Sequence, residues 1–258
     1  MEFTEAQLNQ WLADFFWPLV RIAAMVMAAP IFNTRQIPVR FRLLLAVLIT
    51  LLVQPVLPPS PVVAVFSVDA VLIAAQQIAI GASLGFLMQM VFNALIFGGQ
   101  VMAYSMGLGF ANMMDPTNGV NVPVIAQFWL ILAMLAFLMM NGHLVLISAI
   151  VDTFTVMPVA VDGLTRAGLW ELVSWASRMF AAGVLMALPV IISLLLVNVG
   201  MGVVSRAAPQ LNIFAIGFPI TILLGFVLIW MTLPQVMASF GGLVSEAFDH
   251  SVVLLNTR

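Results

Sequence analysis

Residues 179–205 decide the fold, and they read MFAAGVLMALPVIISLLLVNVGMGVVS. This run contains no Asp, Glu, Lys or Arg, and it is longer than the ~20 apolar residues that an α-helix needs to cross the hydrocarbon core of a bilayer. Three further runs without these four residue types occupy residues 43–68, 70–114 and 207–245. The sequence therefore predicts an all-α protein that crosses a membrane several times.

The composition of the whole chain favours a lipid-bound protein and excludes several functions. Of 258 residues, 64% are hydrophobic and 7% are charged, whereas a soluble domain is about 45–50% apolar and about 25% charged. The chain has no cysteine, which excludes disulfides and thiolate metal sites. It has no lysine and a formal net charge of −2, so we expect no binding of nucleic acid. The acidic start, Met1-Glu-Phe-Thr-Glu5, lacks the basic region of a cleaved signal, so we expect the N-terminus to be retained.

The apolar pattern predicts six main helices in one integral-membrane domain, residues 1–258. The six segments lie at about 11–32, 41–57, 69–97, 124–147, 179–203 and 213–240. Proline inside a helix removes a backbone hydrogen bond, so we expect several of these helices to be kinked or broken. The prolines concerned are Pro18, Pro189, Pro219 and Pro234.

Small residues and the two ends of the chain complete the predicted organisation. Gly81-x-x-x-Gly85, Gly98-Gly99 and Gly200-x-Gly202 provide surfaces on which helices pack closely, which favours a bundle of helical hairpins. At the N-terminus, Thr4-x-x-Gln7 has the spacing of a capping box and begins an amphipathic helix at about residues 4–17. At the C-terminus, apolar residues at helical spacing predict a short amphipathic helix in the tail, residues 243–258.

The arginines do not orient the predicted spans. On the six-segment pattern, four arginines of the connections lie on one side and three on the other, which gives no clear bias. Either some of the predicted spans are wrong, or the chain is not a simple serpentine across a bilayer.

The sequence contains no motif that indicates catalysis, and we expect a protein without catalytic residues, cofactor or metal. The Gly-x-x-x-x-Gly-Lys, His-Glu-x-x-His and Gly-x-Ser-x-Gly patterns are absent, and two histidines are too few for a multi-histidine site. His143 is either a proton carrier or a structural histidine at a helix end. Arg21 lies inside the first segment, and it is either a functional charge or an arginine that reaches the membrane surface or pairs with Asp14.

Residues 104–123, YSMGLGFANMMDPTNGVNVP, form the most unusual stretch of the chain. Glycines and turn residues take the backbone out of helical geometry there, but Phe110, Met113 and Met114 are side chains that a solvated loop rarely exposes. Irregular backbone at membrane depth is tolerated only within protein or along a cavity. The stretch is therefore either a plug or constriction of a channel, or a packed connecting loop.

Together with two other motifs, this stretch closely resembles the FliR/SctT family, whose flagellar FliR members are subunits of the type III protein-export gate. The matching text is Gly107-Leu-Gly-Phe-Ala-x-x-x-Asp115-Pro116, Asn141-Gly142-His143, and Arg206-x-x-Pro209-Gln210-x-Asn212-Ile-Phe214-x-x-Gly217-Phe218-Pro219. Order, spacing and length agree over essentially the whole chain. Virulence-type homologues usually carry a lysine just after the last proline, where this chain has Ile220-Thr221, so the flagellar branch is favoured.

The resemblance implies a non-catalytic pore subunit in the bacterial inner membrane and flagellar basal body, through which unfolded flagellar components pass. Its implied partners are FliP-like and FliQ-like subunits in a helical pore, FlhB-like and FlhA-like export proteins, the exported substrates, and membrane lipid. The segment 107–123 is the implied plug, with channel residues Gly107, Gly109, Phe110, Asn112, Met113, Met114, Asp115, Pro116 and Gly119. The implied subunit-interface residues are Arg206, Pro209, Gln210, Asn212, Phe214, Gly217, Phe218 and Pro219.

Two alternative functions remain at this point. One is the equivalent subunit of a virulence type III secretion system. The other is a small-solute transporter with broken helices and a site near the membrane midplane, although the chain shows no clear inverted repeat.

Overall fold

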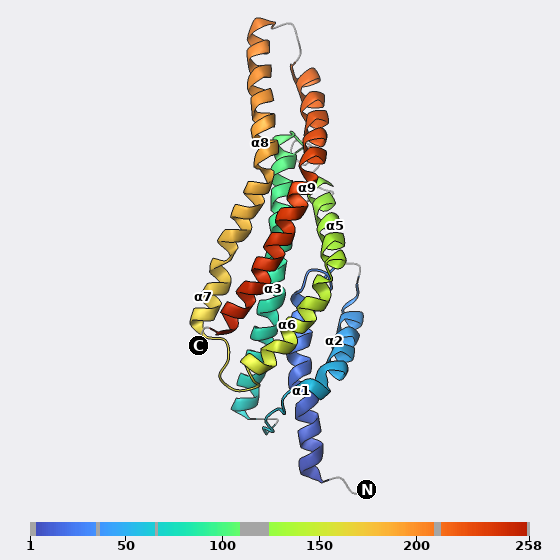
Figure 1. Ribbon diagram of the computed structural model, residues 1–258, viewed down its shortest axis with the longest axis vertical. Helices are drawn as coiled ribbons and strands as arrows, with labels where there is room; N and C mark the ends of the chain where they lie inside the picture. Colours follow the sequence, from blue (N-terminus) through green and yellow to red (C-terminus); the bar gives the residue numbers. More distant parts are fainter. Residues whose placement is uncertain (1–3, 35–36, 65–66, 109–123, 209–212, 257–258) are drawn as a thin grey trace. The chain divides into compact units, whose positions relative to one another are not determined.

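The computed structural model describes residues 4–34, 37–64, 67–108, 124–208 and 213–256, and their regular structure is entirely helical (Figure 1). The elements are α1 Glu5–Ala28, α2 Val39–Val53, the 3-10 turn η1 Gln54–Val56, α3 Val68–Ser105, α5 Val124–Met139, α6 Gly142–Val156, α7 Arg166–Ser174, α8 Ala176–Ala207 and α9 Ile213–Asn256. The prediction of an all-α chain is confirmed.

Five stretches of helix in the described ranges are long and apolar enough to cross a membrane, and a sixth span results if α5 and α6 are counted as one. These two helices meet at an angle of 68°. The break falls at Asn141, whose φ of 55° places it in the left-handed region. The predicted segment 124–147 is therefore wrong at its end, because the chain bends at Asn141 and then continues in α6 to Val156.

The helices α3, α8 and α9 extend beyond the apolar segments predicted for them. α9 continues through Gly241 and Gly242 to Asn256, so the predicted tail is helical but continues α9 instead of forming a separate helix. At the other end of the chain, Thr4 accepts a hydrogen bond from the Gln7 backbone and the Gln7 side chain accepts one from the Thr4 backbone. The predicted capping box is confirmed, and the helix that it begins runs without a break into the first span.

Tertiary contacts divide the chain into two compact units. The first unit comprises Met1–Met90, Leu138–Ala176 and Val244–Arg258, and the second comprises Val91–Phe137 and Ser177–Leu243. Since α3, α8 and α9 each contribute to both units, the division follows packing and not the order of the sequence. A single domain over residues 1–258 stays a prediction.

In the first unit, α1 and α3 approach closely through the predicted glycine pair. A Cβ atom added to Gly81 would lie 2.0 Å from the carbonyl oxygen of Arg21, and one added to Gly85 would lie 2.5 Å from Cβ of Ala28. Both distances are far shorter than a carbon atom tolerates. Only glycine fits at these two positions of α3, as expected for close helix packing in membrane proteins.

Arg21 lies at the centre of the first unit and is 0% exposed. Its Nε donates to Oε1 of Gln77 on α3 (2.7 Å), and its two terminal nitrogens donate to Oγ1 of Thr153 on α6 (2.9 Å) and to the carbonyl oxygen of Met157 (2.9 Å). The guanidinium carbon also lies 4.0 Å from the ring centroid of Phe154. One side chain thus ties α1 to α3 and to the end of α6 through neutral acceptors and an aromatic face.

Of the two alternatives given for Arg21, the one in which it reaches the membrane surface or pairs with Asp14 is wrong. Asp14 is engaged elsewhere, because its Oδ1 accepts hydrogen bonds from the backbone N–H of Ser60 (2.7 Å) and from Nε2 of Gln10 (2.9 Å). Gln10 also donates to the carbonyl oxygen of Ser60 at 2.9 Å. These contacts fasten the proline-rich connection between η1 and α3 to the side of α1.

In the second unit, the pair Gly98-Gly99 places α3 against two different helices. A Cβ atom at Gly98 would lie 2.8 Å from the carbonyl oxygen of Gly183 on α8, and one at Gly99 would lie 2.8 Å from the Cα of Ala126 on α5. The close helix packing predicted for this pair is therefore present, with α8 against Gly98 and α5 against Gly99. By contrast, Cβ atoms at Gly200 and Gly202 would meet nothing within 4 Å, so the contact predicted for that motif is not made among the described residues.

Replacing Arg21 tests whether it holds the first unit together. In Arg21→Ala, the acceptors on Gln77, Thr153 and Met157 lose their donor, and each buried polar group left without a partner costs about 1–3 kcal/mol. We expect a markedly lower melting temperature in mild detergent, followed by fluorescence. Arg21→Lys should lie between this variant and the original chain, because a single ammonium does not reproduce the guanidinium fork.

The exposed Arg166 at the start of α7 provides the matched control, and Arg166→Ala should leave the melting temperature nearly unchanged. A melting temperature of Arg21→Ala within about 1 °C of the original chain would contradict the role assigned to Arg21.

Candidate functional site

The described part of the plug-like segment begins where α3 ends, and its first residues form a helix-capping motif. The backbone N–H of Gly107 donates to the carbonyl oxygen of Tyr104, and that of Leu108 donates to the carbonyl oxygen of Ala103, both at 3.0 Å. These two bonds, together with a φ of 84° at Gly107, define a Schellman motif. Glycine adopts this backbone conformation without strain. The chain thus leaves helical geometry at the first glycine of the stretch, as predicted.

The helix α9 packs directly on this capping motif. A Cβ atom at Gly107 would lie 3.0 and 3.1 Å from two ring carbons of Phe218, which shows how closely the ring covers the glycine. The hydroxyl of Thr221 lies within donating distance of the carbonyl oxygens of Phe218 (3.0 Å), in its own helix, and of Met106 (3.3 Å). A Cβ atom at Gly225 would lie 2.5–2.7 Å from three side-chain atoms of Met106. Met106 itself is 0% exposed. We call this cluster of Met106, Gly107, Phe218, Thr221 and Gly225 the plug anchor, after the segment 107–123 that the family resemblance predicts to be a plug.

The plug anchor joins the two stretches that the sequence singled out, and two of its members, Gly107 and Phe218, are predicted site residues. The sequence did not indicate Met106, Thr221 or Gly225 as site residues. A signal for two of them is present, because Gly217, Thr221 and Gly225 are small residues spaced four apart, and all three are buried in the structure. Such spacing places them on one face of α9, where another helix packs closely.

Most of the other predicted channel residues lie outside the described residues. These are Gly109, Phe110, Asn112, Met113, Met114, Asp115, Pro116 and Gly119. Their role stays a prediction.

The predicted interface residues divide into four groups. Arg206, Phe218 and Pro219 are exposed, whereas Gly217 is buried within this chain. Phe214 belongs to α9, but its side chain is not described. Pro209, Gln210 and Asn212 lie outside the described residues. Exposure leaves the first group free to meet a partner, while Gly217 serves the packing of α9.

The members of the plug anchor can hold the end of α3 against α9 by packing. Its five members carry no ionisable side chain, and four of them, Met106, Gly107, Phe218 and Gly225, make close packing contacts. In the described part of the chain, no group of three or more His, Cys, Asp or Glu side chains is placed to hold a metal ion. His143 lies in the first turn of α6, where its Nδ1 is buried and makes no hydrogen bond with described residues. Its assignment as proton carrier or structural histidine stays a hypothesis.

The helices define an all-α polytopic membrane protein. Residues 12–247 match the family described as bacterial export proteins, family 1, and the chain belongs to this family.

Curated relatives agree with the family assignment. The chain is 41% identical over 249 residues to the flagellar biosynthetic protein FliR of Pectobacterium carotovorum subsp. carotovorum, which covers 96% of this chain and 95% of the relative. The same values hold for the flagellar biosynthetic protein FliR of Escherichia coli (strain K12). The FliR of Buchnera aphidicola subsp. Acyrthosiphon pisum (strain APS) is 34% identical over 258 residues, with 100% and 98% covered. The resemblance inferred from the sequence motifs is confirmed.

Substituting Gly107 tests the plug anchor. Gly107→Ala places a methyl group against Phe218 and a side chain at a φ of 84°, so we expect a loss of about 1 kcal/mol or more in the stability of the second unit. The measurement is the melting temperature of the purified chain in detergent. Adding Phe218→Leu should recover part of the loss, because it removes the ring that the methyl group meets.

Gly202→Ala is the matched control, since its new methyl group meets nothing within 4 Å and lies inside a helix, where alanine is the better residue. Equal losses in Gly107→Ala and Gly202→Ala would contradict the plug anchor.

Proposed function

We propose that this chain is a non-catalytic subunit of the flagellar type III protein-export gate in the bacterial inner membrane, at the flagellar basal body. The observation that carries the proposal is the similarity to flagellar biosynthetic proteins FliR over 96% of the chain. Partial coverage would leave room for a different function in the unmatched part, but here almost the whole chain and the whole relative align. The several apolar helices support a membrane location.

The gate is proposed to be a hetero-oligomer. Large apolar side chains remain exposed along the two longest spans of the second unit, among them Leu196 at 74%, Leu223 at 68% and Trp230 at 75%. Apolar surface of this extent is covered by lipid or by neighbouring subunits. FliP-like and FliQ-like subunits are the proposed neighbours in the pore, and FlhB-like and FlhA-like proteins are the proposed export partners. The exposed Arg206, Phe218 and Pro219 are the described candidates for these contacts.

Within the gate, the segment 107–123 is proposed to close the resting channel, with Phe110, Met113 and Met114 as the sealing side chains. Unbranched methionine side chains adapt to varied partners, which suits a seal that opens and closes. The contacts of Gly107 and Met106 with α9 support a segment whose first residue is held in place. Gly107, Gly109 and Gly119 are the proposed positions at which the backbone changes conformation to let the rest of the segment move.

The export function is tested by deleting the gene from its native host. We expect cells without flagellar filaments and without export of flagellar components into the medium, measured by immunoblotting of the culture supernatant. Expression of the original chain should restore export. Normal export after deletion, or a loss confined to virulence proteins, would contradict the flagellar assignment.

The plug is tested with single cysteines, since the chain has none of its own. In Phe110→Cys and Met113→Cys, we expect cross-links to partner subunits in the resting gate, and labelling by a thiol reagent that changes when an export substrate is lodged in the channel. Leu52→Cys on the exposed side of α2 is the control, and its labelling should not change.

Shortening the segment should also increase the leakage of small ions, measured by a membrane-potential dye. The plug would be contradicted if shortening the segment caused no leakage and if the labelling of the cysteines did not change with the substrate.

A further inference from the structure

The helix α2 of the first unit is covered on one side only. It packs against α1 (Figure 1), and its buried residues are Ala46, Ile49 and Thr50. Five described stretches are long and apolar enough to cross a membrane, and the one that contains α2 buries the smallest share of its residues. The other side of α2 therefore needs a cover that the described part of this chain does not provide.

The uncovered side of α2 carries one arginine at the end of a row of leucines. Arg40, Leu44, Leu48 and Leu51 follow one another at helical spacing, so they lie along one stripe of the helix. Arg40 is exposed, and the three leucines are 54%, 50% and 52% exposed. At 1.5 Å per residue, the stripe extends about 17 Å from Arg40. This length is close to half of a hydrocarbon core of about 30 Å, which is the depth that one acyl chain fills.

The positive charge at this end of α2 is not balanced by an acid. The sequence has no Asp or Glu between Asp14 and Asp69, and Arg40 makes no ion pair with any described residue. Arg42 donates to three neutral acceptors in the connection that precedes α2, so its charge is not neutralised either. Two cations without a counter-charge attract an anion to this end of the helix.

The residue types on the uncovered side favour lipid over a protein neighbour. Helices that meet in a membrane gain little from apolar burial, so their contacts are rich in small residues. The small residues of α2 are Ala46 and Thr50, and both are buried. Apart from Arg40, every exposed side chain of α2 is a large apolar one. Such a surface fits acyl chains well and gives a second helix no place for close approach.

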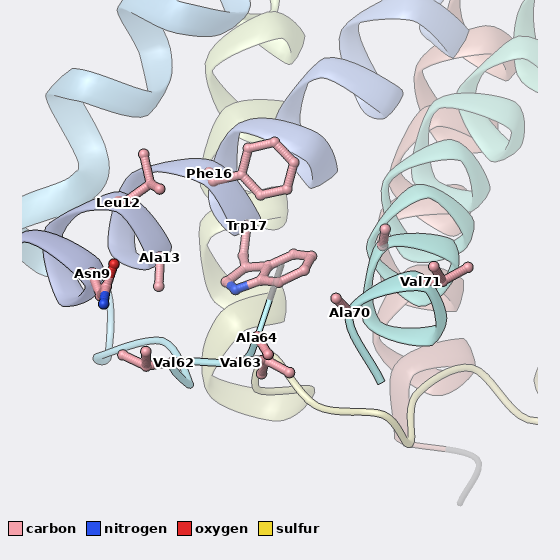
Figure 2. A pocket seen from close by; sticks show the side chains of 11 residues that line it. Asn9, Leu12, Ala13, Phe16, Trp17, Val62, Val63, Ala64, Ala70 and Val71 are labelled. Carbon is pink, nitrogen blue, oxygen red and sulfur yellow. The ribbon is translucent and has the colours of Figure 1, made fainter. Parts of the chain in front are cut away.

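The arginine on the apolar face also distinguishes α2 from a hollow of about 480 Å³ between α1 and the start of α3 (Figure 2). Leu12, Phe16 and Val71 line that hollow and are exposed, but none of the residues that line it is charged. The hollow thus carries no sign of what covers it, whereas α2 combines an apolar stripe with a site for an anion.

We propose that the uncovered face of α2 binds an anionic phospholipid, with the phosphate at Arg40 and an acyl chain along Leu44, Leu48 and Leu51. The guanidinium donates to the phosphate oxygens, and its aliphatic stem lies along the apolar surface. Arg42 adds to the positive potential, which favours a lipid with a net negative charge over a zwitterionic one. The proposal goes beyond the export-gate function and does not rest on it.

A photoreactive residue identifies the occupant on the full chain in native membranes. With p-benzoylphenylalanine in place of Leu48, irradiation should give adducts whose added mass is that of a phospholipid, measured by mass spectrometry of the purified chain. An unirradiated sample is the control. A discrete adduct with a protein, or the lack of any lipid adduct, would overturn the proposal.

The charge of the headgroup is tested with the full chain in nanodiscs of phosphatidylcholine. These contain a trace of either phosphatidylglycerol or phosphatidylcholine that carries a diazirine in its acyl chain. We expect phosphatidylglycerol to label α2 at least about fivefold more strongly, and Arg40→Ala to lower this ratio about fivefold, as expected for one arginine near anionic lipid. Arg40→Lys should keep most of the preference, because lysine also binds phosphate.

Arg166→Ala is the matched control, because it removes another exposed arginine at the start of a helix, α7, and should leave the labelling of α2 unchanged. Equal labelling by both lipids in the original chain, a ratio that Arg40→Ala does not lower, or an equal fall in Arg166→Ala would overturn the proposal. Neither measurement reads export, so a failure here is distinguishable from a failure of the export-gate function.

Discussion

The hydrogen bonds of the buried Arg21 are the constraint on which the first unit depends. A guanidinium without exposure to solvent needs its N–H groups paired, and here three acceptors from α3, from α6 and from the turn after α6 provide this. The same stretch of α1 forms the close contact with Gly81, whose missing side chain leaves room for the Arg21 carbonyl. One residue therefore sets the position of α1 through its backbone and its side chain at once.

Close contacts at glycine and polar contacts at helix ends recur throughout the chain. Gly98 and Gly183 bring α3 and α8 together, and the end of α3 is closed by Gly107 under the ring of Phe218. Apolar side chains gain little by leaving lipid for a helix interface, so shape and hydrogen bonds decide which helices pair. This explains why a chain with 64% hydrophobic residues still depends on a few glycines and polar side chains for its specific packing.

Local sequence patterns predicted the helices well, but they could not predict contacts between residues that are far apart in the sequence. Uncharged runs located α2, α3, α8 and α9, and the capping box at Thr4 was correct. The tail at 243–258 was predicted as a separate helix, but α9 continues into it through Gly241 and Gly242, because glycine is tolerated inside a long helix. Asn141 bends the chain inside the segment 124–147, where one continuous helix was predicted. The partners of Arg21 and the pairing of Gly107 with Phe218 join distant segments, and no local pattern encodes them.

The burial of Arg21 also bears on the order in which the chain is made. Its three acceptors follow it by 56, 132 and 136 positions, so they emerge from the ribosome long after α1. Until then, the first span carries an arginine whose placement at a bilayer centre costs about 2.5–3.5 kcal/mol on insertion scales. During synthesis, α1 therefore lacks the hydrogen bonds of Arg21 that stabilise its position. It gains all three only when more than half of the chain has followed it into the membrane.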